Sequence, residues 1–408
     1  MTKALLVALC LVSFTTLAET KLNFNGDAFV RGYFLNGTGP DHTQAFNQFF
    51  RLNVDAKPDE HLTIKTGLVL SGNTWEGDKH HTNAINSTVG TDGGGGDTTR
   101  LDHAVIEYNK DGWVTSAGRQ VVSTPGNFLT SDDRRDRIQV LKFFSNYNLL
   151  AFAYDKRAEG ALSQGKDDLD MYSVSFYGTY NNLRYAIQTG YWVSKRYSNT
   201  TNALEAVNLD NIKQISPQLS GTYLGVDFDI YYTLLFNGSG KIVTNFSTLT
   251  SEPLYNSDHH AFAFKLAKDL SIMKVEYESA ITKNGGLIAN GFDTLSSVIN
   301  NSPDHKQSSI KLKSIGLGLG RSNADEYTHM LRFSKIISND LQLSIGGGFA
   351  KLYTFTETET SASIEDDTVL DATAKYTISK NLNFAAAYGK FFGDNKDHAG
   401  SLTLNANF

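Results

Sequence analysis

The sequence predicts an all-β fold: a transmembrane antiparallel β-barrel of 16 or 18 strands, with short turns at one rim and long loops at the other. Three observations lead to it. Apolar and polar residues alternate with a period of two from end to end, short and long connections follow each other regularly, and the 408 residues include 35 Gly, 19 Tyr and 25 Phe but only 6 Pro. A membrane barrel needs apolar side chains only at every second position, so low overall hydropathy is compatible with it.

The first 18 residues are typical of a secretory signal peptide, with Lys3, an apolar run and the small residue Ala18 before the expected cleavage site. The lone cysteine, Cys10, lies in the apolar run, and Leu9 before it is too large for a lipidation signal. We therefore expect a mature chain from residue 19 to 408 without disulfides, forming one barrel domain with no linker.

The alternation is clear at residues 22–34, 50–57, 226–234 and 370–378. It continues to the last residue, where Leu402, Leu404, Ala406 and Phe408 share one face of the segment "SLTLNANF". A chain end of a soluble domain is usually frayed. We expect residues 399–408 to be the closing strand of the barrel, because a barrel needs its last strand to pair with its first.

The connections alternate in length along the chain. Short ones are predicted at 109–112, 180–182, 268–269, 339–340 and 380–381, and long ones at about 72–98, 122–136, 198–210, 238–258, 284–306 and 356–367. A hairpin of this kind uses roughly 40 to 48 residues, which gives about 16 to 18 strands. A direct count gives the odd number 19, so we expect a strand to be missed or split between 284 and 325. A barrel of this size leaves an aqueous lumen.

The alternation places charged residues of both signs on the non-lipid face. The bases expected there include Arg31, Arg51, Arg184, Lys265 and Lys375. The expected acids include the following residues: Asp27, Asp155, Asp227, Asp229, Glu276, Glu278 and Asp371. A mixed lining predicts weak ion selectivity, and it is also compatible with simple solvation of an inner wall.

The segment "GRQVVSTPGNFLTSDDRRDRIQV", residues 118–140, is the densest in charge. It resembles the third long loop of the outer-membrane general porins of Gram-negative bacteria (OmpF/OmpC-like), which folds into the barrel and narrows it. Residues 122–136 are thus a candidate constriction loop. Its basic and acidic residues are adjacent in the sequence, whereas in those porins they come from separate segments. The candidate constriction or lining residues are Arg31, Arg51, Arg119, Asp132, Asp133, Arg134, Arg135, Asp136 and Arg137.

The resemblance implies an outer-membrane location and passive diffusion of small hydrophilic solutes and ions through a water-filled pore. It implies a homotrimer in contact with outer-membrane lipid and lipopolysaccharide, no cofactor, no metal and no nucleic-acid partner. It also implies that the C-terminal strand with Phe408 is the signal read by the barrel-assembly machinery.

Two other functions are compatible with the sequence: a substrate-specific channel for a sugar or an organic acid, and a β-barrel enzyme. "DGGGGD" at 92–97 lacks the Lys-Ser/Thr ending of a phosphate loop. The histidine pairs at 80–81 and 259–260 lack a third metal ligand at suitable spacing. Both features are therefore better explained as parts of external loops.

Overall fold

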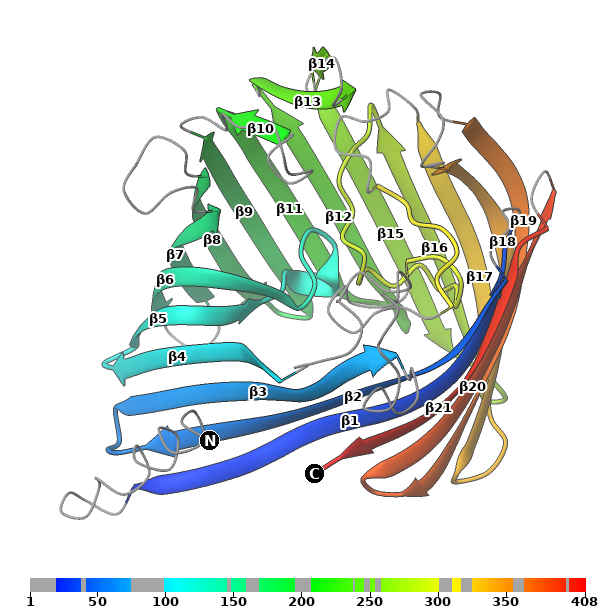
Figure 1. Ribbon diagram of the computed structural model, residues 1–408, viewed down its shortest axis with the longest axis horizontal. Coiled ribbons are helices and arrows are strands. Elements are labelled where there is room, and N and C mark those ends of the chain that lie inside the picture. Colours follow the sequence, from blue (N-terminus) through cyan, green and yellow to red (C-terminus); the bar gives the residue numbers. More distant parts are fainter. Residues whose placement is uncertain are drawn as a thin grey trace, which may run out of the picture.

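The computed structural model describes residues 20–37, 42–74, 99–144, 148–158, 169–194, 207–237, 239–245, 250–253, 258–300, 310–316, 325–354, 363–393 and 396–408. The predicted signal peptide, "DGGGGD" and the first histidine pair lie outside these residues. In the described part, 18 antiparallel strands form one closed sheet (Figure 1), which confirms the predicted barrel. The strands are β1 (Lys21–Asn36), β2 (His42–Lys57), β3 (Leu62–Thr74), β4 (Arg100–Lys110), β5 (Trp113–Val122), β6 (Asp133–Phe144), β7 (Asn148–Ala158), β8 (Leu169–Tyr180), β9 (Leu183–Ser194), β11 (Ile212–Tyr223), β12 (Val226–Phe236), β15 (His259–Asp269), β16 (Lys274–Lys283), β17 (Glu326–Ile336), β18 (Leu341–Thr354), β19 (Ser363–Ser379), β20 (Leu382–Gly393) and β21 (His398–Asn407).

The barrel closes where β21 pairs with β1, with Ala28 opposite Ala406 and Arg31 opposite Thr403. The pairing extends one residue beyond β21, because the backbone N–H of Gly26 donates to Phe408 at 2.8 Å and that of Phe408 donates back at 3.0 Å. The last strand is therefore held on both edges, by β20 and by β1. This is the arrangement expected for residues 399–408.

The two faces of each strand differ as the alternation predicts. Large apolar side chains such as Phe24, Ile138, Phe152 and Leu402 are exposed on the outer face. The residues at the alternate positions of these strands face inward and are buried or paired, as Arg137 and Asp155 are. Because the outer face of the barrel contacts lipid, many apolar side chains lie on the outer surface of the barrel instead of forming one central core.

The two rims also differ. The hairpins β4–β5, β8–β9 and β11–β12 each turn through two residues, and the turn residues Asp111, Asn181 and Leu224 have positive φ. Exposed aromatic side chains gather at these turns, including Tyr108, Trp113 and Tyr180. Long connections leave the opposite rim, where β10 (Val207–Asp210), β13 (Ser239–Asn245) and β14 (Thr250–Pro253) form a separate three-stranded sheet.

The expectation of a missed strand between 284 and 325 is wrong for the described residues. Residues 284–300 and 310–316 form no barrel strand and carry only an isolated bridge between Ile299 and Lys313. The segment instead folds into the barrel, where Figure 1 shows it in yellow in front of the strands from β12 to β17. In the part of the chain that is described, no helix is long and apolar enough to span a membrane.

Candidate functional site in the barrel lumen

Two segments enter the barrel and meet there. The first, called the short insert, comprises residues 123–132 between β5 and β6 and contains the single 3-10 turn η1 (Pro125–Asn127). The second, called the long insert, comprises residues 284–300 and 310–316 between β16 and β17. The N–H of Ala289 donates to the carbonyl of Phe128 at 2.8 Å and joins them. Figure 1 shows the short insert, in cyan, facing the long one inside the ring of strands.

The short insert is closed by its own hydrogen bonds. The hydroxyl oxygen of Thr124 accepts the N–H groups of Leu129 at 3.0 Å and Thr130 at 3.1 Å. At its tip Gly126 has φ 65°, and a Cβ there would lie 2.2 Å from the Tyr231 hydroxyl oxygen. Only glycine fits this position, because both the backbone conformation and the contact exclude a side chain. The tip is thereby held against the inner wall at β12.

An aromatic cluster joins the inserts to the wall. The ring of Phe128 stacks on that of Tyr231 at 5.3 Å and meets the edge of Phe292 at 5.2 Å. The Lys265 ammonium lies 4.3 Å from the centre of the Phe292 ring, within the range of a cation–π contact. One side chain from each insert and two from the wall therefore pack as a unit.

The long insert is anchored to the wall by carboxylates. Asp371 accepts the N–H of Ser297 at 2.9 Å, and Glu326 accepts that of Gly316 at 2.9 Å. Lys313 forms an ion pair of 2.7 Å with Asp367, with both side chains almost fully buried. Apolar side chains complete the contact with the strands: Ile288, Phe292, Leu295, Val298, Ile299, Ile310 and Ile315 pack with Ala261, Ala263, Ala280, Met330, Leu352, Val369 and Phe391. The lumen is narrowed by a packed structure.

Paired charges line the wall from β1 to β6. Arg51 bonds Asp27 at 2.7 Å and Asp102 at 3.1 Å. Arg134 in turn bonds Asp102 at 2.8 Å and Asp132 at 2.7 Å. The chain of contacts joins β1, β2, β4 and β6 and reaches the base of the short insert. These side chains are largely buried, so each charge is stabilised by its partners.

A second group of ion pairs joins β6 to β7. Arg135 bonds Asp133 at 2.8 Å and Asp155 at 2.9 Å, and Asp155 also accepts from Arg137. Arg135 further donates to the hydroxyl of Thr130 in the short insert at 2.9 Å. This group therefore orients the short insert as well as lining the wall.

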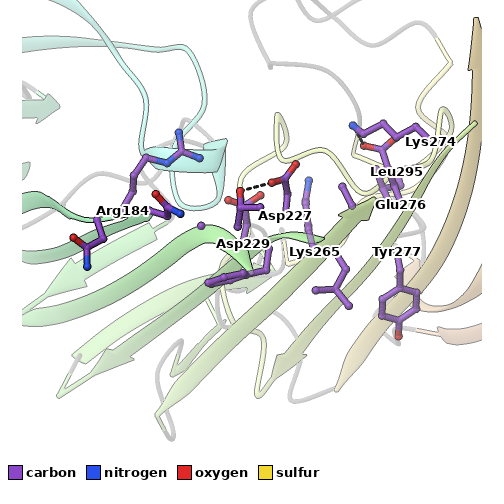
Figure 2. Close-up of a pocket in the computed structure, with 15 residues that line it drawn as sticks. Arg184, Asp227, Asp229, Lys265, Lys274, Glu276, Tyr277 and Leu295 are labelled. Carbon is purple, nitrogen blue, oxygen red and sulfur yellow. Dashed lines mark hydrogen bonds and ion pairs between the residues drawn. The ribbon is translucent and has the colours of Figure 1, made fainter. Parts of the chain in front are cut away.

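A charged cleft of about 500 Å³ lies at the short-turn side of the inserts. Figure 2 shows Arg184 at one side of it and Lys265 and Glu276 at the other, with Asp227 and Asp229 between them; Tyr277 points away. Asp227 accepts a hydrogen bond from Thr222 at 2.5 Å. Lys265 is directed at the carbonyl of Asp293 in the long insert. The cleft thus brings three basic and three acidic side chains around one small space, since Lys274 pairs with Glu276.

Arg184 differs from the other luminal arginines. Its side chain is exposed, and it makes no hydrogen bond or ion pair with a described residue. A second cavity of about 380 Å³ adjoins the same residue and extends to Pro125 and Gly126 of the short insert. Arg184 therefore stands between two cavities below the constriction, with its guanidinium available to a solute.

The candidate residues from the sequence do not form one group. Arg31 and Arg51 lie on the inner wall, where Arg31 donates to Thr403 at 3.0 Å. Asp132 lies at the end of the short insert, but Asp133, Arg134, Arg135, Asp136 and Arg137 lie on strand β6. The proposed loop 122–136 is thus shorter in the structure, because β6 begins at Asp133 and pairs with β5 from there.

Arg119 and Asp136 face outward, contrary to their assignment to the pore. They are register partners on β5 and β6 and form an exposed pair of 3.6 Å on the barrel exterior. The reason is strand periodicity: Arg119 is six residues after Trp113, an exposed side chain at the turn, so both share one face. The sequence contained this signal.

Sequence reasoning missed the long insert as part of the site. The available signal was its apolar side chains, Ile288, Phe292, Val298 and Ile299, which are out of place in an external loop. The second histidine pair begins β15, where the hydroxyl of Tyr232 lies 2.8 Å from His260 and the ring of His259 contacts the Asn284 carbonyl. The described residues contain no cluster of three metal-ligating side chains.

A closed 18-stranded barrel with segments folded into its lumen is the fold of outer-membrane porins. No protein-family model matches the chain, and no curated protein matches it in sequence. Solved structures do. A BenF-like porin from Pseudomonas fluorescens Pf-5 matches with a TM-score of 0.61 and 13% identity over 97% of this chain and 100% of the other.

Two further structures match in the same way. They are the outer-membrane protein OpdK from Pseudomonas aeruginosa, with a TM-score of 0.58 and 11% identity over 95% of this chain and 98% of the other, and OccAB3 from Acinetobacter baumannii, with a TM-score of 0.58 and 11% identity over 95% and 99%. OpdK has also been solved with vanillate. These likenesses establish the fold. The three structures named here are not the OmpF/OmpC-like general porins that the sequence resembles.

Proposed function

We propose that this protein is a substrate-specific channel in the outer membrane of a Gram-negative bacterium, through which a small organic acid diffuses passively. The observation that carries the proposal is the charged cleft beside two joined inserts, with Arg184 at one side of it and without a hydrogen bond or ion pair to a described residue. A solute that passes the inserts must move close to this guanidinium. Specificity then follows from contact with the wall as well as from pore width.

Packing of the inserts favours a specific channel over a general one. The long insert buries Phe292, Val298 and Ile299 completely against the barrel. The buried ion pair between Lys313 and Asp367 holds its second part, residues 310–316, against β19. A constriction that is part of a packed core keeps a defined shape, because such cores tolerate little rearrangement. The similarity to channel structures supports a non-enzymatic function.

The chemistry of Arg184 favours a carboxylate over a sugar. A guanidinium presents a planar fork of donors that matches a carboxylate with two parallel hydrogen bonds. Asp227 and Asp229 lie nearby and would reject a solute with several negative charges, which favours a single carboxylate. That OpdK has been solved with vanillate, an aromatic carboxylate, agrees with this chemistry.

Single-channel recording in planar bilayers tests the proposal, with vanillate as the probe and vanillyl alcohol as its neutral analogue. We expect vanillate to reduce the current saturably, and the neutral analogue to have no such effect. In Arg184→Ala the half-blocking concentration should rise about tenfold, the effect of losing one charge-assisted hydrogen-bond pair. Lys375→Ala is the matched control, since it removes a basic residue on β19, outside the cleft.

Large ohmic currents that no carboxylate reduces would contradict the proposal and support a general porin. Equal loss of block in Arg184→Ala and Lys375→Ala would point to a general field effect without a site. We also propose a homotrimer, inserted by the barrel-assembly machinery through the strand that ends at Phe408. Conductance steps in multiples of three are then expected, and steps of one would contradict the trimer.

A further inference from the structure

The smaller cavity beside Arg184, of about 380 Å³, is bounded by two successive rows of inward side chains on β8, β9, β11 and β12. The lower row, nearer the short turns, consists of the register partners Thr179, Arg184, Ser220 and Asp229. The upper row, two residues further along each strand, consists of Tyr177, Ala186, Gln218 and Tyr231. Pro125 and Gly126 of the short insert also line the cavity.

The two rows differ in charge. The lower row contains Arg184 and Asp229, whereas the upper row contains no carboxylate, guanidinium or ammonium group. In the upper row Ala186 lies between Tyr177 and Gln218. Because Ala186 carries only a methyl group, it leaves space between the two longer side chains. A solute in this cavity therefore meets a charged wall at one end and a neutral polar wall at the other.

Gln218 is a buried polar side chain whose hydrogen-bonding capacity is unused. It is 7% exposed, and neither its amide nitrogen nor its amide oxygen has a hydrogen-bond partner among the described residues. Buried polar groups are almost always paired in native proteins, because an unpaired one loses its contacts with water and gains nothing in return. Gln218 therefore presents one donor and one acceptor to the occupant of the cavity that it lines.

Other polar side chains of the same wall have internal partners. The hydroxyl of Ser216 lies 2.8 Å from that of Thr233. Gln188 donates from its amide nitrogen to the Tyr177 hydroxyl at 2.5 Å, and Gln214 donates to the carbonyl of Gln188 at 3.4 Å. Gln218 differs from these neighbours in position as well, because Gln188, Gln214 and Ser216 do not line the cavity. The side chain with both amide atoms unpaired is thus the one that borders the space next to Arg184.

We propose that this cavity is a subsite for an amide group, and that the solute is therefore a carboxylic acid that also carries an amide. The inference rests on the function proposed above, in which the carboxylate of the solute contacts Arg184. The solute amide N–H donates to Oε1 of Gln218, and the solute carbonyl accepts from Nε2. Arg184 and Gln218 are diagonal neighbours on adjacent strands, with Cβ atoms roughly 7 Å apart, so one small molecule reaches both.

The chemistry of the cavity favours an amide over the other polar groups of small acids. An amide carries a donor and an acceptor side by side and satisfies both atoms of Gln218 together, whereas a single hydroxyl satisfies one of them at a time. A second carboxylate would find no cation in the upper row and would be repelled by Asp229 of the lower row. An apolar group would leave the amide of Gln218 buried and unpaired.

Single-channel recording tests the subsite with two probes of nearly equal shape, 4-carbamoylbenzoate and 4-acetylbenzoate, in which a methyl group replaces the amide nitrogen. We expect 4-carbamoylbenzoate to block the current at an about tenfold lower concentration, because 4-acetylbenzoate leaves the acceptor of Gln218 unpaired. Gln218→Met should abolish this preference, since it removes both polar atoms at similar length. Gln214→Met is the matched control, because Gln214 lies on the same face of β11 but outside the cavity.

Ala186→Leu tests the space without changing Gln218, and it should also abolish the preference because the larger side chain fills the cavity. Equal block by the two probes in the unchanged protein would overturn the subsite and assign water as the partner of Gln218, while the carboxylate site at Arg184 would stand. A preference that survives both Gln218→Met and Ala186→Leu would likewise overturn it. Failure of the proposed function has a different signature: neither probe, nor vanillate, would then reduce the current, and the subsite would fall with it.

Discussion

The two halves of the inner wall use charge differently. From β1 to β7, arginines and aspartates pair with one another along the wall, as Arg51 does with Asp27 and Asp102. From β16 to β19, inward acids such as Asp371 and Glu326 bond the backbone of the long insert instead. The same alternation of sequence produces both. The two halves differ in the groups that pair with the inward charges, and these groups come from residues far away in the chain.

The largest effect is expected where a charge holds the insert. Lys313→Met leaves Asp367 buried without its cation, which costs about 3 to 5 kcal/mol when one member of a buried pair is removed. We expect the long insert to detach and the single-channel conductance to rise severalfold. The double variant Lys313→Met with Asp367→Leu should restore much of the loss, because an apolar pair of similar volume replaces the buried ion pair. Conductance that stays at the original value in the single variant would contradict the anchoring role.

A smaller effect is expected at the aromatic cluster. Phe292→Ala removes a fully buried ring that contacts Phe128 and Tyr231, at a cost of about 3 kcal/mol. The current should become noisier and vanillate block weaker as the two inserts lose contact. Phe128→Ala should act similarly, and the double variant should lose less than the sum because the rings share one contact. Additive losses would mean that the inserts are held independently.

The paired half of the wall should respond less. Arg51→Ala removes one base from a chain in which Asp102 keeps Arg134, so we expect a loss of about 1 kcal/mol and a shift of the reversal potential toward cations. Arg51→Lys should retain the reversal potential but lose the geometry that joins two carboxylates. A conductance increase as large as that of Lys313→Met would remove the distinction between the two halves.

The smallest effect belongs to Arg119. Its pair with Asp136 is exposed on the outer face, where such pairs contribute about 0 to 1 kcal/mol. Arg119→Ala should therefore leave both the reversal potential and vanillate block unchanged in planar bilayers. A clear change in ion selectivity would return this residue to the pore wall.

Much of the barrel follows from local sequence, because a period of two fixes which residues share a face. The alternation predicts that Arg184, Asp229 and Lys265 face inward, and they lie around the luminal cleft. The prediction that Arg119 lines the pore is wrong, because Arg119 and the exposed Trp113 are an even number of residues apart on one strand and therefore share its outer face. The long insert could not be predicted in this way, since its apolar residues pack on β15 to β20 through contacts without a sequence period. Arg184 stands out only once its neighbours are known.

Closure of the barrel also has a kinetic meaning. The contact between Arg31 and Thr403 spans 372 residues, so the seam between β1 and β21 is the costliest loop to close. Until it forms, the growing sheet has two open edges that can pair with other chains. Folding speed should depend on this seam more than on any hairpin, and weakening it should slow assembly before it lowers the final stability.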